Sequence, residues 1–252
     1  MVKCKPSFKF AEKTMSVTRL EEFLEKISTD LDRTVKFWLT HSHDLQYGSP
    51  NAMNVADGYP RSVWMYCKLY TDVERFHKQE ILDAAVRGAD FLMKHAKNPE
   101  TNKCHLVVTR DGKSVKIQGT LFSECFYLMA MSELARASGE TKYKEEACQM
   151  MKTLQRCVET HGESLGIFKL EGVAPSSMLA IPMMILCVID QLETMDPNLC
   201  YKDLSAWAVQ DALKHVQVRD MGFKLEYTIY DLKLRVPIQS NYTFRPTRDT
   251  QT

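Results

Sequence analysis

The stretch LFSECFYLMAMSELARASGE (residues 121–140) decides what kind of fold this chain can form. Its apolar side chains recur at steps of three and four residues, which predicts one face of a helix; they are Phe122, Cys125, Phe126, Met129, Ala130 and Leu134. Gly139 stands where a left-handed residue would end this helix. Glu124 falls among the apolar positions, where a carboxylate is costly unless it is paired or faces a polar cavity.

Six further segments of the chain show the same helical period, at about residues 17–39, 61–76, 79–96, 141–159, 177–195 and 199–217. The short linkers predict that successive helices pair as antiparallel hairpins. Pro182 lies inside an apolar helical stretch, so we expect it to kink that helix or to mark its true beginning. Tyr47–Tyr59 contains Gly, Pro and Asn without periodicity, which is typical of a loop.

Strand patterns occur in two places. Asp111-Gly112 lies between Leu106–Arg110 and Lys113–Ile117, which predicts a short β-hairpin near residues 106–117. From about Met221 apolar residues alternate with polar ones, which predicts a strand that either pairs locally or forms an edge prone to association. The sequence therefore predicts an all-α protein with one hairpin and a C-terminal tail of different character.

Composition and charge exclude several classes of function. Hydrophobic residues make up 44% of the chain and charged residues 26%, and the net charge of +1 provides no basic surface for a nucleic acid. The first residues, MVKCKPSFKFAEK, lack the apolar core of a signal peptide, and the longest apolar run, Met178–Ile189, is too short to cross a membrane. The eight cysteines never form a CxxC pair, so we expect reduced thiols and a cytoplasmic protein.

Two positions stand out as candidates for binding. Arg61 lies beside Trp64 and Tyr66, and a guanidinium next to a flat aromatic wall is a common way to hold sugars and anions. Glu124 is the second candidate. A structural explanation is equally open, in which an arginine–glutamate pair ties two helices together. The sequence contains neither a GxGxxG nor a GxxxxGK[ST] motif, and its histidines do not have the spacing of metal ligands.

Five stretches resemble the N-acylglucosamine 2-epimerase family in order and spacing, over about residues 19–219. They are FWLTHSHD (37–44), RSVWMYCKLY (61–70), LVVTRDGKSVKIQ (106–118), LFSECFYLMAMSELARASGE (121–140) and IPMMILCVIDQL (181–192). The resemblance implies an (α/α)6 barrel, here incomplete, around a sugar pocket. It also implies an isomerase that interconverts N-acetylglucosamine and N-acetylmannosamine, in amino-sugar and sialic acid metabolism, by removing and returning the C2 proton.

The resemblance also assigns candidate site residues and partners. Arg61 falls on the pocket arginine of the family, which holds and polarises the substrate, while Glu124 and Ser177 are weaker candidates for binding sugar. The family chemistry needs no cofactor or metal, and ATP is expected as an allosteric effector. A homodimer is expected, and renin is a further possible partner.

A leucine-zipper-like run of the family reads here as Ile185, Leu192 and Leu199. The next leucine, Leu204, comes two residues early for a heptad, and Pro197 interrupts the run. Apolar heptad positions in a core helix serve either core packing or a coiled-coil dimer, and the sequence leaves both interpretations open.

The chain also departs from the family. The region between Asp44 and Val63 is shorter, and Asp57 stands where relatives have a sugar-facing tryptophan, so the residues leading into Arg61 are not expected to be helical. The resemblance stops near residue 219, which predicts a partial epimerase domain over 1–219 and a divergent tail over 220–252. The two catalytic histidines of the family have no counterpart here, so we expect no catalytic residue in this chain and no activity from it alone.

Two other functions stay open. The chain could be a non-catalytic partner that binds a full-length epimerase subunit or renin. It could also be a different (α/α)6 enzyme, such as a glycoside hydrolase that uses Asp44 and Glu124 as paired carboxylates, a chemistry that requires a defined separation between them.

Overall fold

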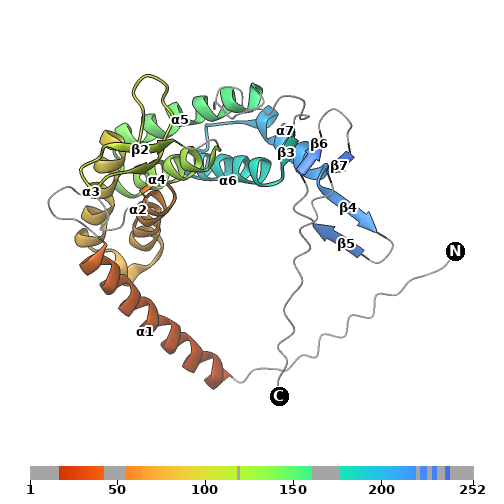
Figure 1. The fold of residues 1–252 in the computed structure, drawn as a ribbon. Coiled ribbons are helices and arrows are strands. Elements are labelled where there is room, and N and C mark those ends of the chain that lie inside the picture. Colours follow the sequence, from red (N-terminus) through yellow and green to blue (C-terminus); the bar gives the residue numbers. More distant parts are fainter. Residues whose placement is uncertain are drawn as a thin grey trace, which may run out of the picture. The chain divides into compact units, whose positions relative to one another are not determined.

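A computed structural model describes residues 17–42, 55–117, 120–160, 176–219, 222–225, 229–231 and 236–238. Figure 1 shows the helices and strands as a ribbon. The helices are α1 (Val17–His41), α2 (Val55–Asp72), the short 3-10 helix η1 (Glu74–Phe76), α3 (Gln79–His95), α4 (Phe122–Ser138), α5 (Thr141–Glu159), α6 (Ala180–Met195) and α7 (Lys202–Leu213). The strands are β1 (His105–Val108), β2 (Ser114–Ile117), β3 (Ser176–Met178), β4 (Val216–Arg219), β5 (Gly222–Leu225), β6 (Ile229–Asp231) and β7 (Val236–Ile238).

The chain divides into two units, Met1–His43 and Asp44–Thr252. Helix α1 is the described part of the first unit. It covers residues 17–39, which the spacing of the apolar residues predicts to be helical, so this prediction is confirmed. Leu20, Leu24 and Ile27 lie on one face of this helix and are exposed. The second unit contains all the other helices and strands.

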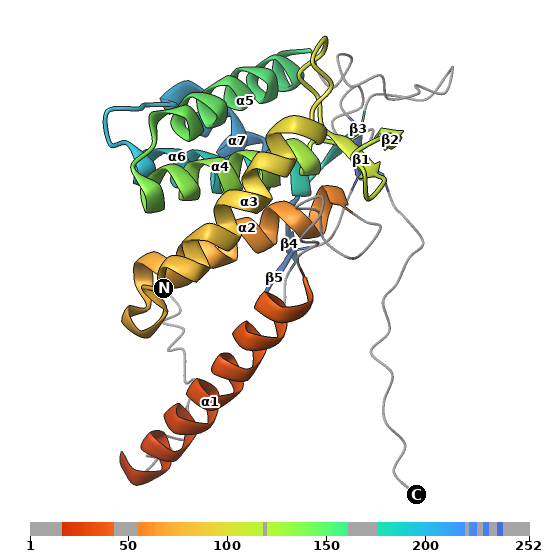
Figure 2. The same cartoon turned by 90° about the vertical axis from the view of Figure 1, so that its left-hand side faces the viewer.

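The helices of the second unit alternate between two layers. Successive helices pair as α2–α3, α4–α5 and α6–α7, and α4 also packs between α2 and α6. Helices α2, α4 and α6 therefore form an inner layer, which α3, α5 and α7 cover; Figure 2 shows α5 running alongside the inner helices α4 and α6. This alternation is the arrangement of an (α/α)6 barrel, so the predicted fold class is confirmed.

Helix α4 is buried on most of its sides because it is the middle helix of the inner layer. Its fully buried large side chains include Tyr127, Leu128, Met131 and Leu134, and burial of one such side chain contributes about 1.5–3 kcal/mol. The helix ends as predicted at Gly139, whose φ of 73° is left-handed. Among the described helices, none combines the length and apolar composition needed to span a bilayer.

The prediction that Tyr47–Tyr59 is entirely a loop is wrong at its end, because α2 already begins at Val55. The residues leading into Arg61 are therefore helical, which also corrects our expectation for that segment. Tyr59 is 3% exposed and its ring packs edge-on against Phe91 of α3, with 5.9 Å between the centroids. This burial favours the helix although Pro60 lies inside it and lacks the N–H that would bond one turn back.

The sequence predicts that Pro182 either kinks a helix or marks its beginning, and the structure shows the second outcome. It lies in the first turn of α6, where a backbone N–H has no partner within the helix. The predicted start at residue 177 is wrong, because Ser176–Met178 forms strand β3 and pairs with β6. Helix α7 likewise ends at Leu213, earlier than its period predicts.

The predicted β-hairpin is confirmed. Strands β1 and β2 pair in an antiparallel register, and Gly112 in the connection has a φ of 85° that glycine adopts without strain. In the segment predicted as a strand from about Met221, β5 pairs locally with β4 and β6 pairs locally with β7, while β6 also pairs with the distant strand β3. Local pairing, one of the two open outcomes for the tail, is therefore observed, and the pairing of β6 with β3 is an addition that was not predicted.

Candidate functional site

Arg61 lies on the inner-layer helix α2, and its side chain is exposed. Its guanidinium carbon lies 4.0 Å from the centroid of the Phe126 ring on the neighbouring helix α4. The guanidinium of Arg61 forms neither an ion pair nor a hydrogen bond with the other residues that the structure describes. A guanidinium that stacks on an aromatic ring keeps its in-plane N–H donors available, so this pair can hold an oxygen-rich ligand against a flat apolar wall.

The aromatic residues that the sequence places beside Arg61 have different roles. Tyr66 is 1% exposed and belongs to the core. Trp64 is half-buried, and its indole Nε1 donates a hydrogen bond of 3.0 Å to Oε1 of Gln191 on α6. The aromatic wall at Arg61 is instead Phe126, which sequence reasoning assigned only to the apolar face of its helix.

Glu124 does not meet Arg61. Its side chain is 1% exposed, and Oε1 accepts a hydrogen bond of 2.9 Å from the backbone N–H of Cys104. Burial, and secondly the charge of Glu124, raise the pKa of the Cys104 thiol. Arg61 and Glu124 therefore do not form the helix-tying pair that the structural explanation proposed, and Glu124 holds the segment that leads into β1.

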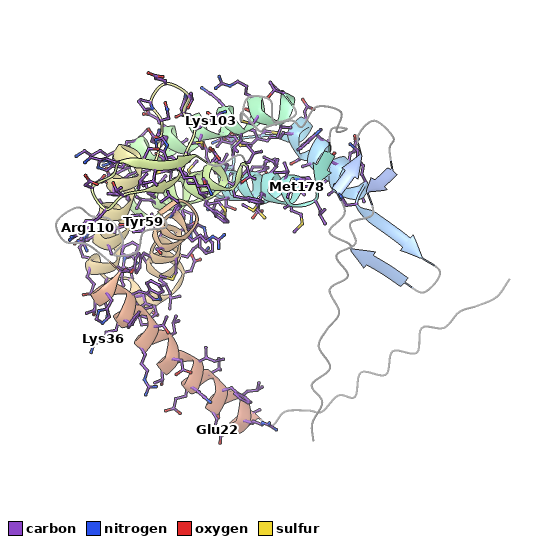
Figure 3. The ribbon with its side chains drawn as sticks, in the orientation of Figure 1. Glu22, Lys36, Tyr59, Lys103, Arg110 and Met178 are labelled. Carbon is purple, nitrogen blue, oxygen red and sulfur yellow. The ribbon has the colours of Figure 1, made fainter. Side chains whose placement is uncertain are left out.

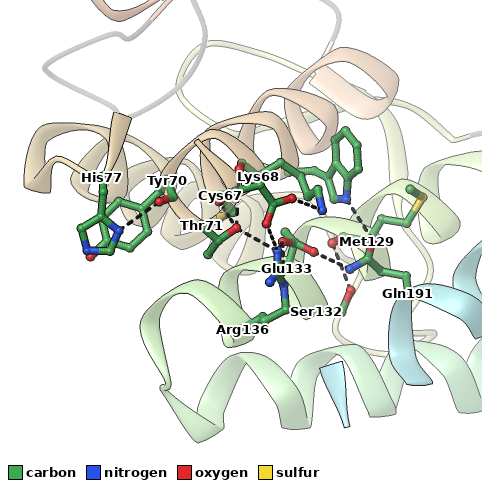
Figure 4. Close-up of polar contacts among 12 residues, drawn as sticks. Cys67, Lys68, Tyr70, Thr71, His77, Met129, Ser132, Glu133, Arg136 and Gln191 are labelled. Atoms are coloured by element: carbon green, nitrogen blue, oxygen red, sulfur yellow. Dashed lines mark hydrogen bonds and ion pairs between the residues drawn. The ribbon is translucent and has the colours of Figure 1, made fainter. Parts of the chain in front are cut away.

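An arginine–glutamate pair does exist, but between two other residues. Oε1 of Glu133 accepts a bond of 2.9 Å from Nε of Arg136, also on α4, and a second bond from Nη2. Nη2 of Arg136 also donates to Thr71 and Asp72 at the end of α2, and Gln191 of α6 donates to Oε2 of Glu133 (Figure 4). Glu133 raises the pKa of the Arg136 guanidinium, mainly through their hydrogen bond.

Sequence reasoning missed this network, although one signal was available. Glu133 is a carboxylate within an apolar helix, the same signal that selected Glu124. Gln191 and Thr71 are common surface residue types that carry no such signal.

The remaining candidates lie before, within and after α6. The backbone of Ser177 belongs to β3 and is paired with Tyr230 of β6, and the next residue, Met178, has an exposed side chain (Figure 3). Ile185 and Leu192 are fully buried within α6. Leu199 lies outside the helix, which ends at Met195, so no continuous heptad helix runs through these three positions.

No histidine belongs to the inner-layer helices α2, α4 and α6. His77 stacks on Tyr70, His95 lies against the β1–β2 connection, and His105 contacts Ser114 within the hairpin. His43 and Asp44 lie outside the described residues. Within the described part of the chain, no group of three histidine, cysteine, aspartate or glutamate side chains could hold a metal ion.

Known proteins of one kind are similar to this chain over most of its length. The family model for N-acylglucosamine 2-epimerase (GlcNAc 2-epimerase) matches residues 48–246. N-acylglucosamine 2-epimerase of Homo sapiens is 41% identical over 212 residues, which cover 79% of this chain and 50% of that protein. The Mus musculus protein of the same name is 40% identical over 228 residues, covering 85% and 54%. The chain thus spans about half the length of the curated relatives it matches.

Solved structures agree on the fold. Cellobiose 2-epimerase from Spirochaeta thermophila superimposes with a TM-score of 0.62 at 16% identity, over 79% of this chain and 56% of that one. Cellobiose 2-epimerase from Bacillus thermoamylovorans gives 0.63 at 15% identity, over 79% and 57%. These enzymes are (α/α)6 barrels, and the alternating helices of this chain correspond to part of such a barrel. The family model and the sequence identity together show that the chain belongs to the N-acylglucosamine 2-epimerase family.

Proposed function

We propose that this chain provides a sugar-binding face of an N-acylglucosamine 2-epimerase, with N-acetylglucosamine and N-acetylmannosamine as its ligands. The observation that supports this most is the exposed guanidinium of Arg61 over the ring of Phe126, on the inner helix layer of the family fold. The apolar ring provides a wall for the C–H face of a sugar, and the guanidinium provides donors for its oxygens.

The reaction of the family explains why such an arginine is useful. In the ring-opened sugar, C2 is adjacent to the C1 carbonyl, and removal of the C2 proton moves negative charge onto the carbonyl oxygen. A fixed cation beside that oxygen stabilises the charge as it develops. Inversion at C2 then requires that a proton returns from the opposite face, so two acid–base groups must flank the sugar.

We propose further that the 252-residue chain binds sugar but does not epimerise it alone. The inner-layer helices that carry Arg61 and Phe126 contribute no histidine. The two buried carboxylates of α4 have structural partners, since Glu124 accepts the N–H of Cys104 and Glu133 is paired with Arg136. The alternative that uses Asp44 and Glu124 as paired carboxylates is less favoured for the same reason.

The binding proposal is tested with two arginine variants. We expect N-acetylmannosamine to perturb NMR signals of the chain, and Arg61→Met to weaken its binding about tenfold or more, because a charged hydrogen bond contributes about 1.5–3 kcal/mol. Arg75→Met is the matched control, because Arg75 stacks on Phe76 with 4.8 Å to the ring centroid but lies in η1. Equal binding by wild type and Arg61→Met would refute the proposed site.

The proposal of inactivity has its own measurement. N-Acetylmannosamine is incubated with the purified chain in D2O, and the C2 proton signal is followed by NMR. We expect no exchange above the rate without protein. Exchange that disappears in Arg61→Met would show instead that the chain itself contains the acid–base groups.

The expected environment and partners stay part of the proposal. The described cysteines are free thiols, and Cys67, Cys104, Cys125 and Cys157 are buried, which fits a reducing compartment such as the cytoplasm. ATP as an effector, and a second subunit or renin as a partner, stay predictions that rest on the family.

A further inference from the structure

Helix α2 is fastened to its neighbours at two places on one face. Trp64 donates to Gln191 of α6 over 3.0 Å. Two turns later, Thr71 and Asp72 accept hydrogen bonds of 2.8 and 2.9 Å from Nη2 of Arg136 on α4. Residues seven or eight apart lie on the same side of a helix, so the two attachments fix how α2 is rotated about its axis.

Both attachments lead to the same buried carboxylate. Glu133 is 1% exposed, and it accepts hydrogen bonds from Arg136 at Oε1 and from Gln191 at Oε2, the latter over 2.6 Å. A buried charge that is paired and bonded at both oxygens stabilises one geometry strongly, whereas loss of one partner leaves a costly unsatisfied group. The network therefore runs from α2 through α6 and α4 and returns to α2 (Figure 4).

The amide of Gln191 has only one orientation that satisfies this network. The indole N–H of Trp64 can only donate, so it requires the amide oxygen, and an ionised Glu133 can only accept, so it requires the amide N–H.

The rotation of α2 determines where Arg61 points. Arg61 lies one turn before Trp64 on the same face of α2, and Phe126 lies two turns before Glu133 on α4. On the N-terminal side of Arg61, Pro60 lacks a backbone donor, and α2 is held there by the packing of Tyr59 against Phe91. We infer that Gln191 is a positioning residue, which holds Trp64 and thereby keeps the Arg61 guanidinium over Phe126; its effect on sugar binding rests on the proposed function.

The inference is tested first on the free chain, without sugar. The stack on Phe126 gives the side-chain protons of Arg61 an upfield ring-current shift in NMR spectra, and we expect Gln191→Leu to lose most of this shift. Trp64→Phe removes the indole donor and reduces the size of the ring but keeps an aromatic side chain, so it is the second variant if Gln191→Leu does not fold. Folded variants that have lower thermal stability but an unchanged Arg61 shift would overturn the inference, because the role of Gln191 would then be structural only.

A rescue experiment separates the hydrogen-bond pattern from packing. Gln191→Glu alone places two carboxylates side by side and is expected to lose the Arg61 shift. Both variants keep an acceptor for Trp64 at residue 191, and the double variant Gln191→Glu with Glu133→Gln also restores a donor–acceptor pair between residues 191 and 133. We expect it to recover the shift, and failure to recover it in a folded protein would contradict the inference.

The sugar arm distinguishes this inference from the proposed function. If the wild type binds N-acetylmannosamine, we expect Gln191→Leu to weaken binding about fivefold, which corresponds to about 1 kcal/mol, because Arg61 is then less well placed, and we expect the double variant to restore binding. If the wild type binds no sugar, the proposed function fails, while the Arg61 shift in the free chain still decides the role of Gln191.

Discussion

Gly112 and His95 are in such close contact that a β-carbon on residue 112 would lie 2.0 Å from Nδ1 of the imidazole. The connection between β1 and β2 thus lies directly on the C-terminal turn of α3. Glycine is required there both by its φ of 85° and by this contact.

The first prediction uses two glycines with similar backbone angles. Gly139→Ala meets no atom within 4 Å at a φ of 73°, so it should lose only about 1–2 kcal/mol of unfolding free energy through backbone strain. Gly112→Ala should lose more, because the imidazole of His95 must also move. Urea unfolding measures both.

A companion variant and a titration check the cause. His95→Ala should remove most of the excess cost of Gly112→Ala. In Gly112→Ala, which keeps His95, the displaced imidazole becomes more exposed. Because burial lowers the pKa of His95 below 6.5, we expect this pKa to rise, and NMR titration measures it. Equal losses for the two glycine variants would contradict the contact.

The second prediction concerns the contact between α2 and α3. A β-carbon on Gly88 would lie 2.7 Å from Cγ2 of Val63, although alanine is the better helix former. Gly88→Ala should therefore destabilise the chain by about 1–3 kcal/mol, as overpacked cores do. The double variant with Val63→Ala should recover part of this loss in chemical unfolding, and an additive effect of the two changes would argue against the contact.

The third prediction is a pH dependence at the end of α2. Hydrogen bonds from Lys68 and Arg136 lower the pKa of Asp72 from 3.8 to about 2. Because the folded-state pKa is the lower one, the stabilisation is complete above the unfolded pKa of 3.8 and disappears as the pH falls towards 2. The unfolding free energy of Asp72→Asn should lack this part of the acid dependence. If the unfolding free energies of variant and wild type change equally with pH between 3.8 and about 2, the prediction is wrong.

The fourth prediction concerns the buried pair on α4. Arg136→Met leaves the Glu133 carboxylate buried without its cation, and breaking such a pair typically costs about 3–5 kcal/mol. The double variant with Glu133→Leu removes the stranded charge and should recover part of this loss, although Gln191 then loses its acceptor. Thermal unfolding compares the two variants, and a double variant less stable than Arg136→Met would contradict this explanation.

Features with a local cause could be predicted from the sequence. The Asp111-Gly112 hairpin and the helix end at Gly139 depend on backbone angles that glycine adopts, and the period of residues 121–140 is enough to predict α4. The helical turn at Val55–Tyr59 could not be predicted, because it is favoured by the contact of Tyr59 with Phe91, 32 positions later in the chain.

The candidate site was predictable only in part, for the same reason. Residue type alone indicates Arg61, but its partner Phe126 follows from how α2 and α4 are rotated against each other. Glu124 and Glu133 have the same local signal, a carboxylate in an apolar helix. One of them bonds the amide of Cys104 and the other bonds Arg136, and only the packing of the helices distinguishes them.

The pairing of β4 with β5 bears on how the chain can be shortened. Val216–Arg219 is hydrogen-bonded to Gly222–Leu225, so a cut after Arg219 would separate the two halves of one hairpin. The strand that is left would expose its backbone groups and offer them to other molecules, a common route to aggregation. A shortened protein for crystallisation or NMR should therefore stop before Val216, or keep the hairpin whole.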